Sequence, residues 1–238
     1  QASMLALGLG RSEVEALLAG RGDGLSIATF LAPDSTVVAG PGDALDRLAA
    51  ELAREEVFQR RLHVDVAYHH AQFEAIEAEL AAAFGPVAHE APALPLYSTL
   101  EGGRIEGARH GLDYWLRNGR HPADFERAVT AALQDGFDAL VEIGPARGMG
   151  AAIRSCASAA GQPVWTGASL IRGEAETPRI RALLSEMYGQ GVPIRWDAHH
   201  AGGRYVRLPG YPWQRTRLWV EAPETRAAAS MSSAPAAV

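Results

Sequence analysis

The sequence predicts an α/β protein in which a small β-α-β-β-α-β unit precedes a region built on a parallel sheet. Three observations lead to this prediction. Within residues 1–67, short apolar runs alternate with amphipathic stretches in that order. From 68 to 172, longer helical patterns alternate with apolar strands, which is typical of a helix-covered parallel sheet. In 173–220 a last helical pattern gives way to an irregular, aromatic and proline-rich linker, and 221–238 form a low-complexity, flexible tail.

Turn signals and periodicity define the elements of the first unit. Ser12 and Asp43 are N-cap residues by type, and each precedes apolar residues at helical spacing. Pro33 and the run Gly40–Gly42 interrupt the strands between the two helices. We therefore expect strands at 4–9, 25–31, 36–39 and 57–67, with helices at 13–19 and 43–52. This order is the split β-α-β, or ferredoxin-like, unit.

The second region has longer elements. Phe73, Ile76, Leu80 and Ala83 recur at helical spacing, so they predict one apolar helix face. The run 94–100 has the composition of a buried strand. The remaining expected elements are strands at 139–143 and 164–170, with helices at 125–135, around Ile153, and at 180–188.

Composition excludes several classes of function. The chain has 238 residues, 47% of them apolar, which is enough for a hydrophobic core. A single cysteine excludes an intramolecular disulfide. The net charge of −6 argues against nucleic acid as a partner, and no apolar run is long enough to cross a membrane. We therefore expect a cytoplasmic protein. Because the chain opens with Gln-Ala-Ser, we expect it to be a piece of a longer one.

Two adjacent histidines are the first candidates for chemistry. His69 and His70 stand where the strand predicted at 57–67 ends and a helix begins. Side chains at such an edge project into clefts, and histidine can act as a general base near neutral pH. Position alone favours the structural alternative, a helix-capping or surface histidine.

No other segment offers a nucleophile, a cofactor loop or a metal site. The sequence contains no Gly-x-Ser-x-Gly elbow. The glycine-rich run Gly144–Gly150 does not match a dinucleotide fingerprint and predicts a tight turn. His199 and His200 lack further ligands at metal spacing. Cys156 is expected to be inert packing, and Glu142 a capping or hydrogen-bond partner. No metal and no bound cofactor are therefore expected.

Five stretches resemble one known family in the same order. The segment Val64–Glu74 resembles the active-site histidine motif of malonyl-CoA:ACP transacylases, specifically the acyltransferase domains of modular type I polyketide synthases. The other four stretches are Thr36–Gly40, Tyr114–Asn118 with Pro122, Val141–Pro145 and Leu208–Arg215. The resemblance covers residues 2–220. It implies a ferredoxin-like subdomain followed by the C-terminal part of an α/β-hydrolase-like subdomain and the linker that follows the acyltransferase.

The resemblance also implies a two-step acyl transfer. A serine takes an extender acyl group from acyl-CoA, and the phosphopantetheine thiol of an acyl carrier protein then accepts it. His69 matches the catalytic base, and Asn118 matches the position whose backbone carbonyl orients its ring. The chain itself is expected to bind no cofactor. Its expected partners are acyl-CoA, the acyl carrier protein, an upstream acyltransferase segment and, through the linker, an adjacent ketosynthase.

Two departures from the family pattern affect what we expect. The serine elbow, the carboxylate-binding arginine and the oxyanion-hole donors of the family lie upstream of the position of Gln1, so the chain alone is expected to be inactive. Leu31 replaces an asparagine that the family usually has, which would remove a polar group near the mouth of the site.

Substrate choice is expected to depend on Val66, Ala67 and Tyr68, which precede the base. The bulk of Tyr68 favours malonyl over methylmalonyl, although one methyl group is worth only ~1–3 kcal/mol in a pocket.

Two other functions compete with the acyltransferase. The chain can instead be a catalytically empty docking module that packs against a ketosynthase. The second is RNA binding through the first unit. It would require aromatic side chains on the sheet surface and basic flanking segments, and the sequence provides neither.

Overall fold

The computed structural model describes residues 2–64, 68–145, 148–199 and 202–218. The chain divides into two compact units, residues 1–194 and 195–238. In the second unit, helix α8 (Trp196–His199) is the one regular element among the described residues, and 202–218 are exposed and irregular. These residues belong to the segment 173–220, whose end was expected to be an irregular linker, and the expected tail 221–238 lies outside the described residues.

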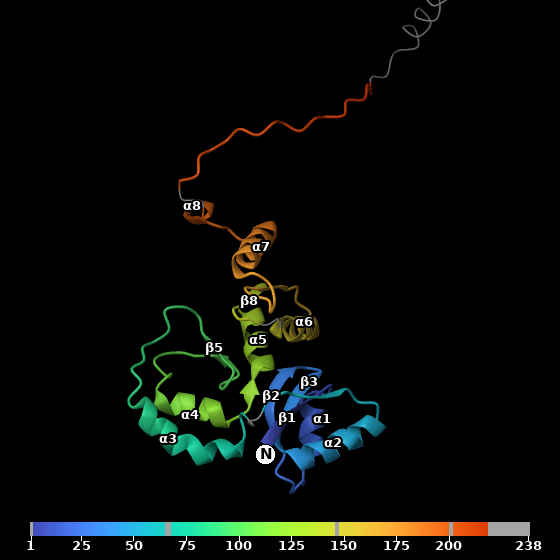
Figure 1. The fold of residues 1–238 in the computed structure, drawn as a ribbon, viewed down its shortest axis with the longest axis vertical. Coiled ribbons are helices and arrows are strands. Elements are labelled where there is room, and N and C mark those ends of the chain that lie inside the picture. The colour runs from blue at the N-terminus through green and yellow to red at the C-terminus, as the bar shows by residue number, and fades with distance from the viewer. Residues whose placement is uncertain (1, 65–67, 146–147, 200–201, 219–238) are drawn as a thin grey trace, which may run out of the picture. The chain divides into compact units, whose positions relative to one another are not determined.

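A five-stranded sheet organises the start of the first unit (Figure 1). Its elements are β1 (Ala2–Leu7), α1 (Arg11–Leu18), β2 (Ser26–Ala32), β3 (Ser35–Pro41), α2 (Gly42–Arg54), β4 (Gln59–Arg61) and the short β7 (Ala123–Asp124). The strand order is β4-β1-β3-β2-β7, with antiparallel neighbours except for the parallel pair β2–β7. The first six elements follow the predicted order along the chain, and β7 adds a strand from far along the sequence.

The register of this sheet sorts its side chains onto two faces. Leu5 lies opposite Val38 in the pairing of β1 with β3, and both are fully buried in a cluster with α1 and α2. Met4 lies opposite Ala39, and both belong to a second cluster on the other face. Because side chains alternate along a strand, the same two strands supply both clusters. The sheet is therefore buried on both sides around its centre.

The rest of the first unit is mainly helical. It comprises the 3₁₀ helix η1 (Ala71–Phe73), α3 (Glu74–Phe84), β5 (Tyr97–Ser98), β6 (Gly103–Arg104), α4 (Leu112–Arg120), α5 (Phe125–Gln134), β8 (Ala139–Glu142), α6 (Met149–Ala159), β9 (Trp165–Ala168) and α7 (Glu176–Gly189). Strands β8 and β9 form the expected parallel pair, while β5 and β6 pair antiparallel. Helices α5 and α6 share a buried cluster with Ala32 at the end of β2.

Several local expectations were wrong. The run 94–100 is not a buried strand, because β5 has only two residues and Leu94 is 78% exposed. Pro95 lacks the N–H that a strand ladder needs, which limits pairing there. Ser12 lies inside α1, whose N-cap is Gly10, and Asp43 lies in the first turn of α2. The strand expected at 57–67 contracts to β4, although residues 65–67 are outside the described part.

Candidate active site around His69

The backbone of His69 adopts an uncommon conformation. Among the described residues, only Glu56 and His69 are non-glycine residues with positive φ, which is 56° at His69. This left-handed region disfavours residues with a Cβ and marks positions that the surroundings must hold. The His69 N–H donates to the carbonyl of Gly119 at 3.1 Å, which ties this turn to the end of α4.

The ring of His69 is held by the same helix end. Its Nδ1 lies 2.8 Å from the carbonyl oxygen of Asn118 and 2.9 Å from that of His121. Carbonyl oxygens only accept hydrogen bonds, so Nδ1 is the donor and carries the proton of the neutral ring. Nε2 then holds a free lone pair. The last carbonyls of a helix lack hydrogen-bond donors within the helix. His69 supplies donors to two carbonyls of α4, those of Asn118 and Gly119.

A close approach between two helices fixes the distance from His69 to α4. Gly119 in α4 faces the ring of Phe73 in η1, and a Cβ at Gly119 would lie 2.3 Å from a carbon of that ring. Only glycine allows this contact without displacing one element. The short segment from His69 to Phe73 is therefore packed directly against the end of the helix that holds the His69 ring.

His70 has a different role from its neighbour. Its side chain is buried, Nδ1 accepts from the N–H of Gln72 at 3.1 Å, and Nε2 donates to the carbonyl of Gly24 at 3.0 Å. His70 thus caps η1 and ties it to the segment before β2. His70 is therefore a helix-capping histidine, the structural alternative given for the pair. Both of its ring nitrogens are already hydrogen-bonded.

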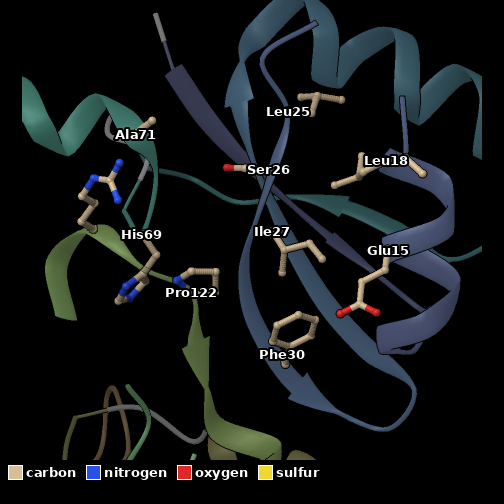
Figure 2. A pocket seen from close by; sticks show the side chains of 11 residues that line it. Glu15, Leu18, Leu25, Ser26, Ile27, Phe30, His69, Ala71 and Pro122 are labelled. Atoms are coloured by element: carbon tan, nitrogen blue, oxygen red, sulfur yellow. The ribbon is translucent and has the colours of Figure 1, made fainter. Parts of the chain in front are cut away.

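His69 lines a pocket of about 440 Å³ whose opposite wall comes from α1 and β2. Figure 2 shows Ile27 and Phe30 on β2, with Pro122 near the His69 ring. Most of the wall is apolar. Its polar members are Glu15, Ser26, His69 and Arg120, and Arg120 is ion-paired with Glu74. The pocket presents Nε2 of His69 beside an apolar wall.

The other residues predicted from the sequence are placed as follows. Asn118 meets His69 through its backbone, as the resemblance implied. Val66 and Ala67 lie outside the described residues. Tyr68 is 55% exposed and does not belong to the pocket lining given above.

Leu31 is one residue away from the wall of the His69 pocket and does not line it. Leu31 packs against the α5–α6 cluster, and its neighbour Phe30 lines the pocket. The β2–β3 register shifts between Phe30 and Ala32, and Leu31 and Ala32 both pack against the α5–α6 cluster.

The secondary candidates have structural roles. Cys156 is buried, and desolvation raises the pKa of its thiol to about 11. The carboxylate of Glu142 accepts from the N–H groups of Gly148 and Met149 at the start of α6. In the described part of the chain there is no cluster of metal-ligating side chains, and no helix has the length and apolarity needed to span a bilayer.

Sequence reasoning missed three members of the site. The carbonyl of His121, the carbonyl of Gly119 and the ring of Phe73 all position His69. A backbone carbonyl belongs to every residue type, so the first two leave no trace in the sequence. A glycine inside a helical pattern was the one available signal, because it often marks close packing.

Comparison with known proteins identifies the family. The family model "Acyl transferase domain" matches residues 1–188. The chain is 37% identical over 222 residues to polyketide synthase GfsB of Streptomyces halstedii, covering 93% of this chain and 4% of that protein. It is 36% identical over 223 residues to erythronolide synthase EryA2 of Saccharopolyspora erythraea, covering 92% and 6%. The chain thus spans a small fraction of these curated relatives.

Solved structures agree with this assignment. The acyltransferase domain from module 8 of the salinomycin polyketide synthase matches with a TM-score of 0.79 and 33% identity, covering 83% of this chain and 47% of that one. The acyltransferase domain of SpnD in complex with 2-(pent-4-yn-1-yl)malonyl matches with a TM-score of 0.71 and 25% identity, covering 80% and 47%. The chain belongs to the acyltransferase-domain family of modular polyketide synthases.

Proposed function

We propose that this chain carries the general base, His69, of an acyltransferase that loads an acyl carrier protein. The enzyme moves an extender acyl group from CoA to the phosphopantetheine thiol of the carrier through an acyl-serine intermediate. The observation that carries the proposal is the pair of carbonyls, of Asn118 and His121, on Nδ1 of His69. They select the tautomer whose Nε2 can accept a proton.

Each half of the reaction uses the same proton shuttle. Nε2 takes the serine proton while the serine oxygen attacks the thioester, and the CoA sulfur leaves with that proton. Nε2 next takes the carrier thiol proton while the sulfur attacks the acyl ester, and the serine oxygen leaves with it. The negative end of the α4 dipole lies at the ring and favours the imidazolium formed in between.

The nucleophile comes from a segment other than these 238 residues. Two observations support this part of the proposal. The sequence has no Gly-x-Ser-x-Gly elbow, and the matching salinomycin domain has about half of its length outside the match, since the chain covers 47% of it. We expect the isolated chain to be inactive and the chain joined to a serine-bearing upstream segment to be active.

The fold supports a division of the chain into two subdomains and a linker. The antiparallel order β4-β1-β3-β2 supports a ferredoxin-like subdomain at 1–67, and the parallel pair β8–β9 supports an α/β-hydrolase-like remainder at 68–172. The exposed aromatic side chains of the linker 173–220, among them Tyr205 and Trp213, support contact with a neighbouring ketosynthase. We assign the assembly to the cytoplasm.

Malonyl is the proposed extender, ahead of methylmalonyl. The support is the residue type at position 68, an aromatic side chain directly before the base. Competition between malonyl-CoA and methylmalonyl-CoA, read by intact mass of the loaded carrier, tests this choice. A carrier loaded mainly with methylmalonyl would contradict it.

The decisive experiment uses the polypeptide that joins this chain to its serine-bearing segment. Acyl-enzyme formation and carrier loading are followed by intact mass after addition of malonyl-CoA. His69→Gln should lower both rates by about 100-fold or more, the usual contribution of a positioned base. The matched control is His199→Gln, in the exposed helix α8, which should load normally. Normal loading by His69→Gln would refute the proposal and favour the docking-module alternative.

A further inference from the structure

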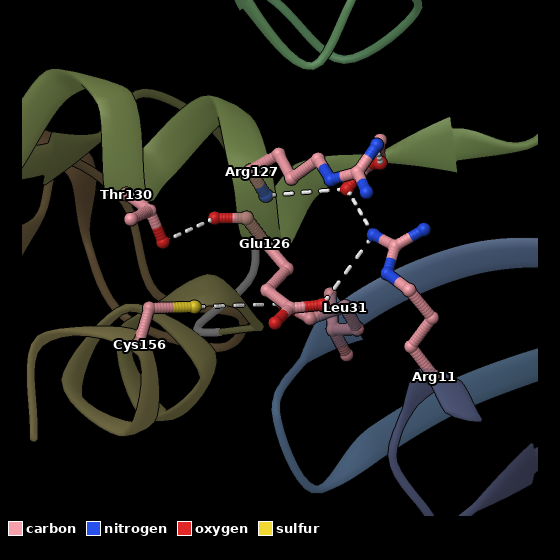
Figure 3. A network of polar contacts seen from close by, with 7 residues as sticks. Arg11, Leu31, Glu126, Arg127, Thr130 and Cys156 are labelled. Atoms are coloured by element: carbon pink, nitrogen blue, oxygen red, sulfur yellow. Dashed lines mark hydrogen bonds and ion pairs between the residues drawn. The ribbon is translucent and has the colours of Figure 1, made fainter. Parts of the chain in front are cut away.

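An arginine far from His69 in the sequence connects α1 to β7. The Arg11 guanidinium lies 3.5 Å from the centroid of the Phe30 ring, and its Nη2 lies 2.7 Å from Oδ1 of Asp124. Figure 3 shows Arg11 extending from α1 toward the start of α5, where Glu126 is a second partner at 3.5 Å. Phe30 and Asp124 are both buried, so water competes little for these contacts.

Asp124 is a junction between several elements. Its side chain accepts from the N–H of Arg127 and caps α5, and its own N–H donates to the carbonyl of Thr99 at 2.6 Å. In the parallel pairing of β7 with β2, Asp124 lies opposite Phe30. Strand β7 has only two residues, so its backbone ladder alone is a weak attachment. The Arg11–Asp124 pair adds a side-chain link across the same junction.

Strand β7 begins two residues after His121. The carbonyl of His121 is one of the two acceptors of His69 Nδ1, and Pro122 lines the same pocket. One residue spans at most ~3.5 Å of chain, and only Pro122 lies between His121 and β7. A displacement of β7 therefore also displaces the His121 carbonyl. The position of this acceptor therefore depends on how firmly β7 is held.

We propose that Arg11 and Asp124 are positioning residues for the general base. Through β7 they hold the His121 carbonyl on Nδ1 of His69, which keeps the ring in one tautomer and one orientation. Neither residue lines the His69 pocket, so they act on the base without touching substrate. The consequence for acyl transfer rests on the function proposed above, whereas the effect on the ring does not.

Nuclear magnetic resonance of the histidine ring tests the first half directly. Ring ¹⁵N shifts of the 238-residue chain, assigned with His69→Gln, report which nitrogen carries the proton. The native chain should show a protonated Nδ1 and an unprotonated Nε2. Arg11→Ala should move the two shifts toward each other, and Arg11→Lys should restore part of the difference. Asp124→Asn keeps a capping oxygen but loses the charge, so it should change the His69 ring shifts in the same direction as Arg11→Ala. It remains available as a test if Arg11→Ala does not fold.

A matched control is available on α2. Arg47 forms an exposed pair with Asp43, and Arg47→Ala should leave the His69 shifts unchanged. Native His69 shifts in a folded Asp124→Asn or Arg11→Ala variant would overturn the inference.

Kinetics of the joined polypeptide test the second half. Losing one of two hydrogen bonds to the ring should slow acylation by about fivefold to thirtyfold in Asp124→Asn. The KM for acyl-CoA should stay unchanged because no substrate contact is lost. A raised KM with a native acylation rate would contradict a positioning role. If His69→Gln also loads normally, the proposed function fails; if only Asp124→Asn loads normally, this inference alone fails.

Discussion

Helices α2 and α3 bury very different amounts of their apolar side chains. Helix α2 buries Ala44, Leu45, Leu48 and Leu52 against the sheet. Helix α3 has the more apolar sequence, yet none of its residues is buried, and Ile76 is 45% exposed. The sheet side is thus held by a hydrophobic core. Around the base, the segment from His69 through α3 is joined to α4 by hydrogen bonds to backbone carbonyls, the Arg120–Glu74 ion pair and the close contact of Phe73 with Gly119.

The largest expected effect is the loss of core packing on the sheet side. Leu48→Ala should lower the free energy of unfolding by about 2–5 kcal/mol, because Leu48 is fully buried. Ile76→Ala on α3 should cost about 0.5 kcal/mol or less. Urea denaturation of both variants measures the contrast. A large cost at Ile76 would show that its face is covered in solution and would remove the difference between the two helices.

A smaller effect is expected where α4 meets η1. Gly119→Ala forces a methyl group into the Phe73 ring, so it should cost about 1–3 kcal/mol in the free energy of unfolding. Combining it with Phe73→Ala should relieve most of that cost, which a double-mutant cycle measures. Gly189→Ala is the matched control, because a Cβ there meets no atom within 4 Å. Equal costs for the two glycine variants would mean that the Phe73 contact does not hold the site.

An effect on stability that is confined to high pH concerns Cys156, which is buried in α6. Burial raises the pKa of its thiol from 9.0 to about 11, so the folded chain keeps the proton more tightly than the unfolded chain. Stability from the neutral thiol is complete below pH 9 and is lost as the pH rises toward about 11. Alkylation by iodoacetamide at pH 8 should be slow in the folded chain and fast in urea. Equal rates in both states would contradict burial.

The sequence allowed the sheet unit to be predicted because its signals are local. Alternating residues such as Leu5 and Leu7, with glycine and proline turns after them, determine strand and helix order without knowledge of distant contacts. Periodicity also located the apolar face of α3, but it carries no information on what covers a face. The exposure of Ile76 was therefore unpredictable.

The candidate site divides in the same way. A side-chain motif led to His69, and the resemblance led to Asn118. The carbonyls of Gly119 and His121 were missed, as was the link from Arg11 to Asp124 across 113 residues. These contacts depend on the path of the chain, which residue types do not specify. Tyr68 illustrates the converse, because its residue type predicts a role in substrate choice while its exposed side chain is not among those that line the pocket.

The dependence of His69 on backbone carbonyls has a consequence for how the site tolerates mutation. All of its described hydrogen bonds, from the ring and from its own N–H, go to main-chain oxygens of residues 118, 119 and 121. No side-chain replacement at positions 118 or 121 deletes an acceptor, so those positions are free to vary for other purposes. Changes that redirect the chain, such as an insertion in the turn after α4, disconnect the base. The site is robust to side-chain replacement at positions 118 and 121 and fragile to changes in length.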